Sequence, residues 1–83
     1  MKNIRFAIIG LGGRGWSLMR NAVMPIEGVE IVGLSDLYPD RCERAQAYVS
    51  EKTGKTPIMN TDYCAMLDEV KPDAVLVATG WEA

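Results

Sequence analysis

The chain contains 83 residues, of which 48% are hydrophobic and 24% are charged, and its formal net charge is −2. This length permits one small domain, and the weakly acidic balance provides no basic surface for nucleic acid or for an anionic membrane. No apolar stretch approaches the roughly 20 residues of a membrane-spanning helix. The sequence therefore predicts a cytoplasmic domain that binds neither nucleic acid nor a membrane.

The composition also narrows the chemistry. The chain has no histidine, which removes His-based general catalysis, Ser-His-Asp triads and the common zinc sites from these residues. Cys42 and Cys64 stand far apart and form no CxxC pair, so both are expected to be free thiols packed on helix faces. We predict no catalytic residue and no metal ligand within the chain.

The first predicted element is a strand over residues 4–9, which is apolar almost throughout, as expected for a strand covered on both faces. Directly behind it, Gly10, Gly12 and Gly15 have the spacing GxGxxG, and a helix over residues 13–24 is expected next. In a dinucleotide-binding loop, Gly10 makes the turn, Gly12 leaves backbone amides bare for a pyrophosphate, and Gly15 allows close helix packing.

Other interpretations of this loop remain open. Glycines after a strand also serve tight turns that bind nothing. Gly13 adds to the glycine-rich loop, and Arg14 stands in the first helical turn. Arg14 either contacts a cofactor phosphate or the adenosine, or it is simply solvated, and an arginine at this place leaves room for NADP.

A second strand, residues 30–35, ends at Asp36, about 20 residues after the last glycine, where dinucleotide-binding folds place an acidic residue. The Asp36 carboxylate can accept hydrogen bonds from both ribose hydroxyls, whereas a 2′-phosphate would meet a like charge. This pattern favours NAD over NADP. The alternative is that Asp36 is a turn residue or a helix cap.

The next helix is expected from Pro39 to about Lys52, with its buried stripe at Cys42, Ala45 and Val49. Arg41 lies in its first turn, where the guanidinium either covers an adenine ring or is solvated.

A short third strand over residues 56–59 is placed near a sheet edge by Pro57. Thr61 or Asp62 can cap a third helix, in which a common face is formed by Tyr63, Met66, Leu67 and Val70. The fourth strand, residues 74–78, is wholly apolar and leads to Thr79.

Strands that alternate with helices predict an α/β fold, Rossmann-like βαβαβαβ, with three layers and a parallel sheet in the order 3-2-1-4. This is a partial dinucleotide-binding fold. Residues 10–15 and Thr79 then face one crevice at the point where the strand order reverses. The fourth strand is left with an unpaired apolar edge, which predicts a homo-oligomer formed through residues 74–78.

With these residues identified, the chain resembles the amino-terminal NAD(P)-binding portion of the Gfo/Idh/MocA oxidoreductases, the family of glucose-fructose oxidoreductase and inositol 2-dehydrogenase. The resemblance covers the whole chain, and its matching stretches are residues 8–15, 36–41, 63–67 and 72–79. It implies that Gly10, Gly12 and Gly15 hold the pyrophosphate, that Asp36 and Arg41 hold the adenosine, and that Thr79 leads to the nicotinamide.

The resemblance also implies what lies outside the chain. Family members carry a larger second domain that binds sugars or related polyols and helps to form oligomers. We therefore expect residues 1–83 to be one truncated NAD(P)-binding domain that is inactive by itself, from a parent dehydrogenase that transfers hydride between nicotinamide and a sugar-like substrate. Members commonly follow the threonine with Pro-Asn, where this chain has Gly80 and Trp81, and their active-site lysine segment would lie beyond Ala83.

Three other functions remain compatible with the same residues. A non-catalytic nucleotide-sensing module would use this fingerprint and lack catalytic groups. A methyltransferase that binds S-adenosylmethionine places a glycine loop and a strand-end acid in a similar way. A glycosidase with tightly held NAD lies within the range of the resembled family.

Overall fold

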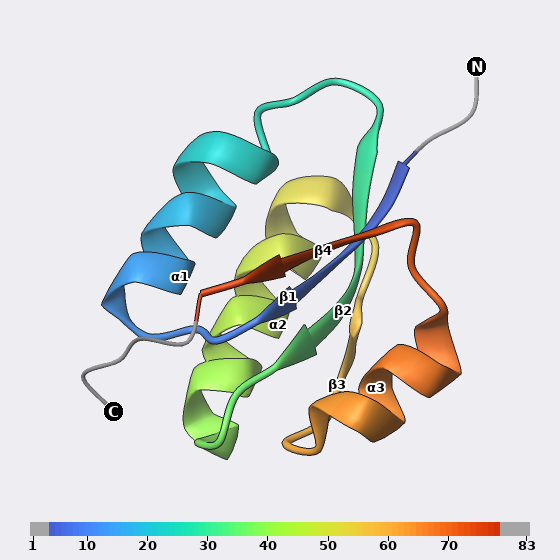
Figure 1. Cartoon of the computed structure of the whole chain (residues 1–83). Helices are drawn as coiled ribbons and strands as arrows, with labels where there is room; N and C mark the ends of the chain where they lie inside the picture. The colour runs from blue at the N-terminus through green and yellow to red at the C-terminus, as the bar shows by residue number, and fades with distance from the viewer. Residues whose placement is uncertain (1–3, 79–83) are drawn as a thin grey trace.

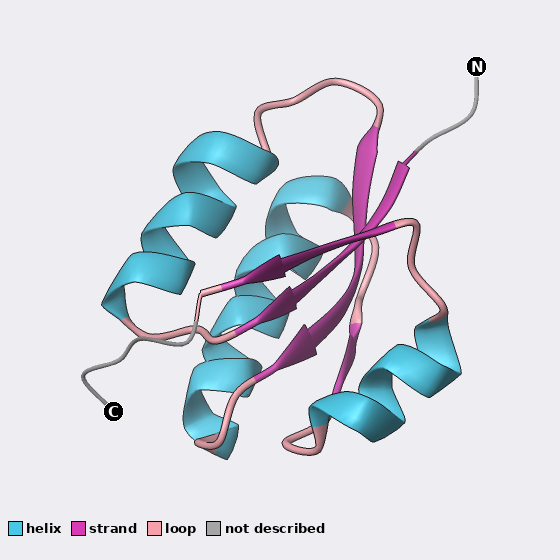
Figure 2. Cartoon of the chain, in the orientation of Figure 1, coloured by secondary structure: helices cyan, strands magenta, loops and turns pink. Residues whose placement is uncertain are grey.

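The computed structural model describes residues 4–78 as a parallel sheet between two layers of helices (Figure 1). Figure 2 shows α1 and α2 on one side of the sheet and α3 on the other. The elements in chain order are β1 (Ile4–Ile9), α1 (Gly13–Leu18), η1 (Met19–Val23), β2 (Val29–Ser35), α2 (Pro39–Thr53), β3 (Ile58–Met59), α3 (Tyr63–Val70) and β4 (Ala74–Val77). The predicted three-layer α/β architecture is confirmed.

The four strands of the sheet lie in the order β3-β2-β1-β4, and all neighbouring pairs are parallel. This confirms the predicted order 3-2-1-4. The central strand β1 pairs with β2 on one side and with β4 on the other, so that its carboxyl end lies between theirs. Because ligands of open parallel sheets bind outside the carboxyl ends of the strands where the order reverses, the end of β1 is the place to search for a site.

Local signals in the sequence explain where two helices begin and end. Pro39 occupies the first turn of α2, where its missing N–H costs nothing, and Gly54 ends that helix with φ of +80°. The Asp62 carboxylate caps α3 by accepting hydrogen bonds from the backbone N–H groups of Cys64 at 3.0 Å and Ala65 at 3.3 Å. Of the two predicted caps, the structure selects Asp62.

The first helix has the expected length but not a uniform pitch. Its second half, η1, is a π-helix, in which the N–H of Met24 donates to the carbonyl of Met19 at 2.9 Å. Met19 and Val23, four positions apart on this helix, are both buried. Apolar spacing of this kind predicts a helix but does not distinguish an α-turn from the wider π-turn.

Each face of the sheet has its own hydrophobic core. Under α1, η1 and α2 the larger cluster includes Ile8, Leu34 and the predicted stripe of α2. Under α3 the smaller cluster contains Ala7, Ile9, Met66 and Val70.

Two packing predictions on α3 were wrong. Tyr63, the first residue of α3, is 51% exposed, and Cys64 is exposed rather than packed. Within residues 4–78, no helix is long and apolar enough to cross a membrane.

Candidate nucleotide-binding site

The glycine loop connects β1 to α1 and bends where the sequence analysis predicted. Gly10 has φ of +97°, a backbone conformation that side chains with a Cβ rarely adopt. Gly15 is buried, and a Cβ atom at this position would lie 1.8 Å from the carbonyl oxygen of Gly10 and 3.3 Å from the Cβ of Ala78. The close contact of α1 with the strand ends therefore requires a glycine at position 15.

The outer part of the loop is open. A Cβ on Gly13 would meet no atom within 4 Å, and a Cβ on Gly12 would meet the guanidinium of Arg41 at 3.2 Å. Arg14 is exposed. Because the first N–H groups of a helix have no partner within it, this loop presents backbone donors to any anion that enters.

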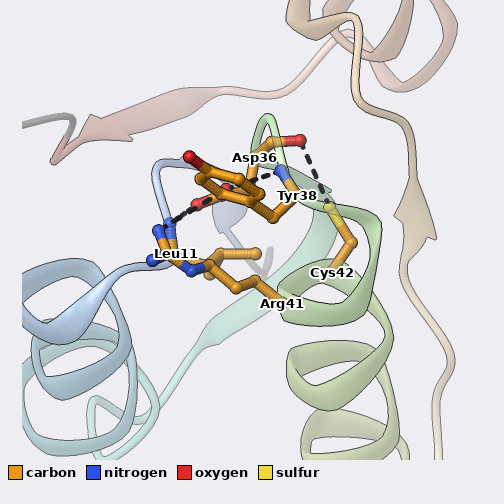
Figure 3. A network of polar contacts seen from close by, with 5 residues as sticks. All are labelled: Leu11, Asp36, Tyr38, Arg41 and Cys42. Atoms are coloured by element: carbon orange, nitrogen blue, oxygen red, sulfur yellow. Dashed lines mark hydrogen bonds and ion pairs between the residues drawn. The ribbon is translucent and has the colours of Figure 1, made fainter. Parts of the chain in front are cut away.

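The Asp36 side chain is buried, with the residue only 8% exposed, and both of its carboxylate oxygens are occupied by the protein (Figure 3). Oδ2 accepts a hydrogen bond from the backbone N–H of Leu11 at 2.6 Å, and Oδ1 accepts one from the N–H of Tyr38 at 2.9 Å. The second contact makes Asp36 a turn residue, which was one of its two predicted interpretations. Since each carboxylate oxygen has two lone pairs, both oxygens still have capacity for a ribose hydroxyl.

Arg41 extends from the first turn of α2 towards this carboxylate. Its Nη1 atom lies 3.8 Å from Oδ1 of Asp36, and its side chain is 43% exposed. The guanidinium stands over the ring of Tyr38, with its carbon 4.6 Å from the ring centroid (Figure 3). Asp36, Tyr38 and Arg41 thus form one cluster next to Gly12.

These groups surround a crevice of about 790 Å³ at the carboxyl ends of β1, β2 and β4. The described residues that line it are Ile9, Gly10, Gly12, Gly13, Arg14, Ser35, Asp36, Leu37, Tyr38, Arg41, Thr61, Tyr63, Val77 and Ala78. Of the predicted site residues, Gly10, Gly12, Gly13, Arg14, Asp36 and Arg41 therefore come together, and Gly15 supports the loop from below. Thr79 lies outside the described residues.

Four polar residues on the crevice wall were not predicted as site residues: Ser35, Tyr38, Thr61 and Tyr63. Tyr38 and Thr61 each follow a strand end, and parallel topology brings strand ends to one edge, so this position was the available signal. Tyr63 was instead assigned to a buried helix face by its apolar spacing.

A smaller hollow of about 370 Å³ lies beside the crevice and shares Gly12, Gly13 and Arg41 with it. Its far wall is Trp16, whose indole is covered by the guanidinium of Arg44 at 4.1 Å. Trp16 also packs edge-on against Tyr48 of α2, at 5.2 Å between ring centroids. The indole therefore joins α1 to α2.

The described residues show little chemistry beyond binding. Burial raises the pKa of the Cys42 thiol, which keeps it protonated near neutral pH, and its Sγ lies 3.8 Å from the backbone carbonyl oxygen of Asp36. Within residues 4–78, no group of three or more Cys, Asp or Glu side chains could hold a metal ion. The described part of the site can bind and orient a ligand through backbone amides, the carboxylate of Asp36 and the guanidinium groups of Arg14 and Arg41.

A strand-to-helix glycine loop, an acid at the end of the neighbouring strand and a parallel sheet in this order define the chain as a Rossmann-type domain. No family model matches the chain. Among curated proteins, it is similar to the glycosyl hydrolase family 109 protein 1 of Akkermansia muciniphila, with 45% identity over 99% of this chain. It covers 18% of that relative, so the chain spans about a fifth of the length of the curated proteins it matches.

Among solved structures, the chain is similar to myo-inositol 2-dehydrogenase from Lactobacillus plantarum. The TM-score is 0.76 at 30% identity, with 95% of this chain and 22% of that chain covered. The fold is shared with scyllo-inositol dehydrogenase from Lactobacillus casei, solved with bound NAD(H) and scyllo-inositol, at a TM-score of 0.73 and 20% identity over 95% of this chain and 22% of that chain. The chain thus has a Rossmann fold, and its predicted resemblance to the Gfo/Idh/MocA oxidoreductases is confirmed.

Proposed function

We propose that the chain binds NAD in the crevice at the carboxyl ends of β1, β2 and β4. The observation that carries the proposal is the buried carboxylate of Asp36, which lies between the glycine loop and Tyr38 and keeps lone pairs available on both oxygens. The open space over Gly13 and the tight contact at Gly15 fit a dinucleotide, because the first leaves backbone amides accessible and the second fixes the loop that carries them.

Each predicted site residue receives a role in this proposal. The diphosphate lies against the backbone of Gly12 and Gly13, with Arg14 as a further cation. Asp36 accepts hydrogen bonds from the adenosine ribose, and its charge disfavours the 2′-phosphate of NADP. Arg41, already held by Asp36 and Tyr38, contacts the adenosine end.

The remaining assignments concern Thr79, which lies outside the described residues, and the other parts of the whole protein. Thr79, two positions after the last residue of β4, is proposed to lead to the nicotinamide half of the cofactor. We propose that residues 1–83 form the nucleotide-binding domain and that a sugar-like substrate is bound by other parts of the whole protein. Support comes from the lengths of the relatives, of which this chain covers 18% to 22%.

We further propose that the whole protein is an enzyme of the NAD-using kind and that this domain alone does not turn over. A bound nicotinamide supplies hydride transfer at a substrate carbon. This chain contributes binding and orientation, and it has no histidine to move a substrate proton. Between the two relatives, the 45% identity to a glycosyl hydrolase family 109 protein favours a glycosidase, and the 30% identity to an inositol dehydrogenase supports a polyol dehydrogenase as the second candidate.

Calorimetric titration of the full chain tests the binding proposal. We expect NAD to bind about tenfold or more tightly than NADP, because one uncompensated like-charge contact costs on the order of 1.4 kcal/mol. S-adenosylmethionine, which has no diphosphate, is expected not to compete. Preferential binding of S-adenosylmethionine, or no nucleotide binding at all, would contradict the proposal.

A second assay separates the two enzyme candidates in the whole protein. With NAD present, a glycosidase releases the phenol from an aryl glycoside without accumulating NADH, whereas a polyol dehydrogenase accumulates NADH in proportion to the polyol oxidised. We expect the first result. NADH accumulation with inositol and no release from any aryl glycoside would establish the second candidate.

A further inference from the structure

We propose that Asp36 has a second role, besides ribose binding: its carboxylate holds the glycine loop in the shape that receives the diphosphate. This inference rests on the proposed function and deepens it. It makes Asp36 a positioning residue for a part of the ligand that its side chain does not touch.

The loop is attached to the end of β2 at two successive backbone groups. The N–H of Gly10 donates to the carbonyl of Ser35 at 2.8 Å, and the N–H of Leu11 donates to Oδ2 of Asp36 at 2.6 Å. The first bond is part of the sheet. The second is made by a side chain and reaches into the loop between Gly10 and Gly12, where strand pairing has ended (Figure 3).

The carboxylate itself is held firmly. Its other oxygen accepts the N–H of Tyr38 at 2.9 Å and faces the guanidinium of Arg41 at 3.8 Å. Since the residue is 8% exposed, little water competes for these contacts, and bonds to an ionised acceptor are stronger than neutral ones. Because the Asp36 carboxylate is held in place, it also holds the backbone N–H of Leu11 that donates to it.

The loop needs such an attachment because of its composition. Glycines lose more backbone freedom on ordering than other residues, and Gly10, Gly12 and Gly13 make up most of this turn. A loop ordered before the ligand arrives does not lose that freedom on binding, which raises affinity through preorganisation. The bond from Leu11 to Asp36 is the side-chain contact that orders it.

The substitution Asp36→Asn distinguishes this role from simple electrostatics when the probe is inorganic pyrophosphate, which contains no ribose. Removal of a negative charge near an anion should strengthen binding if Asp36 acts through charge alone. Asparagine, however, replaces one of the two carboxylate oxygens by an NH2 group that can only donate, so either the Leu11 or the Tyr38 N–H loses its acceptor. Our inference predicts that the loop loosens and that pyrophosphate binds more weakly.

The matched control is Asp40→Asn. Asp40 is exposed in the first turn of α2, lines the neighbouring small hollow, and is a carboxylate without a bond to the loop. We expect Asp36→Asn to reduce pyrophosphate affinity about fivefold, because the loss of one hydrogen bond that orders the loop outweighs the removal of one negative charge. Asp40→Asn should leave the affinity unchanged or raise it slightly.

Amide hydrogen exchange in the ligand-free wild-type chain provides a measurement that needs no variant. Leu11 should be protected although it lies beyond the end of β1, and in Asp36→Asn its protection should fall while that of β2 amides is retained. Exchange of the wild-type Leu11 amide at the rate of an unstructured peptide would overturn the inference, even if the variant failed to fold.

The two proposals fail in different ways. If wild-type protein binds NAD, and Asp36→Asn loses NAD binding but keeps pyrophosphate affinity, Asp36 acts on ribose alone and this inference is wrong. If wild-type protein binds pyrophosphate with a protected Leu11 amide but does not bind NAD, the loop role stands and the proposed function is wrong.

Discussion

The two sides of the crevice are built differently. On the β2 side, contacts of 2.6 to 4.6 Å join Asp36, Tyr38 and Arg41 to one another and to the glycine loop. On the β4 side, the wall consists of Val77 and Ala78, and Val77 is 62% exposed. One side is a network of polar contacts, and the other, as far as residue 78, is an apolar strand end.

This difference indicates which part of a ligand the described residues can recognise. Fixed acceptors and cations on the β2 side suit the ribose and phosphates of an adenosine diphosphate. The β4 side offers apolar surface and an unpaired edge, which gains stability only when another segment covers it. Under the proposed function, the described residues therefore contact the adenosine half of NAD.

The largest expected effect on stability comes from a substitution at Gly15, which packs against both the glycine loop and the end of β4. In Gly15→Ala, the new methyl group would lie 1.8 Å from the Gly10 carbonyl oxygen and 3.3 Å from the Ala78 side chain. Because the closer contact is backbone, relief requires movement of α1. We expect the free energy of unfolding to fall by about 3 kcal/mol or more, measured by chemical denaturation, with loss of NAD binding.

Gly13→Ala is the matched control, since its methyl group would meet nothing within 4 Å and the position is helical. It should be neutral or stabilising by up to about 1 kcal/mol. Equal destabilisation by both substitutions would show that the close packing of Gly15 against Gly10 and Ala78 is not what holds α1 against the strand ends.

A smaller effect is expected from Arg41→Ala, which breaks the β2 side alone. Because the guanidinium is partly exposed, its contribution to the binding energy of NAD is limited, and we expect about a fivefold loss of NAD affinity. The unfolding free energy should stay within about 0.5 kcal/mol of wild type. Calorimetry with NAD and with AMP measures both the size and the location of the loss.

Arg44→Ala controls for the removal of a cation, because Arg44 lies over Trp16 on the far wall of the smaller hollow. Its effect on NAD affinity should be below about twofold. If AMP binding were unaffected by Arg41→Ala while NAD binding fell, Arg41 would act on the other half of the ligand, and the comparison between the two sides would need revision.

The smallest effect on stability is expected on the β4 side. Val77→Lys places a charge on the exposed edge strand and should reduce self-association of the full chain in sedimentation, while the unfolding free energy changes by about 0.5 kcal/mol or less. Ile58→Lys tests the opposite edge, where the two-residue strand β3 follows Pro57. We expect that control to leave association unchanged, and a monomeric wild-type chain at high concentration would contradict the prediction.

The sequence by itself determined the order of elements and the position of the crevice. Apolar runs, a GxGxxG turn, an acid at the next strand end and helix-ending glycines are local signals, and right-handed crossovers leave little choice of strand order. Strand β1, the start of α2 and the buried stripe of Cys42, Ala45 and Val49 agree with those signals. The π-turn of η1 does not follow from them, because two helical pitches share nearly the same apolar spacing.

Only the tertiary structure decided how the site residues divide their bonds. The sequence assigned Asp36 either to a ribose or to a turn, whereas the folded chain shows its carboxylate bound to Leu11 and Tyr38 with capacity left over. The tertiary structure also places Tyr63 on the crevice wall rather than in the core. The hydrogen bond between Leu11 and Asp36 joins residues 25 positions apart. Sequence spacing cannot specify such a contact, because it depends on how closely the strand ends and helices pack.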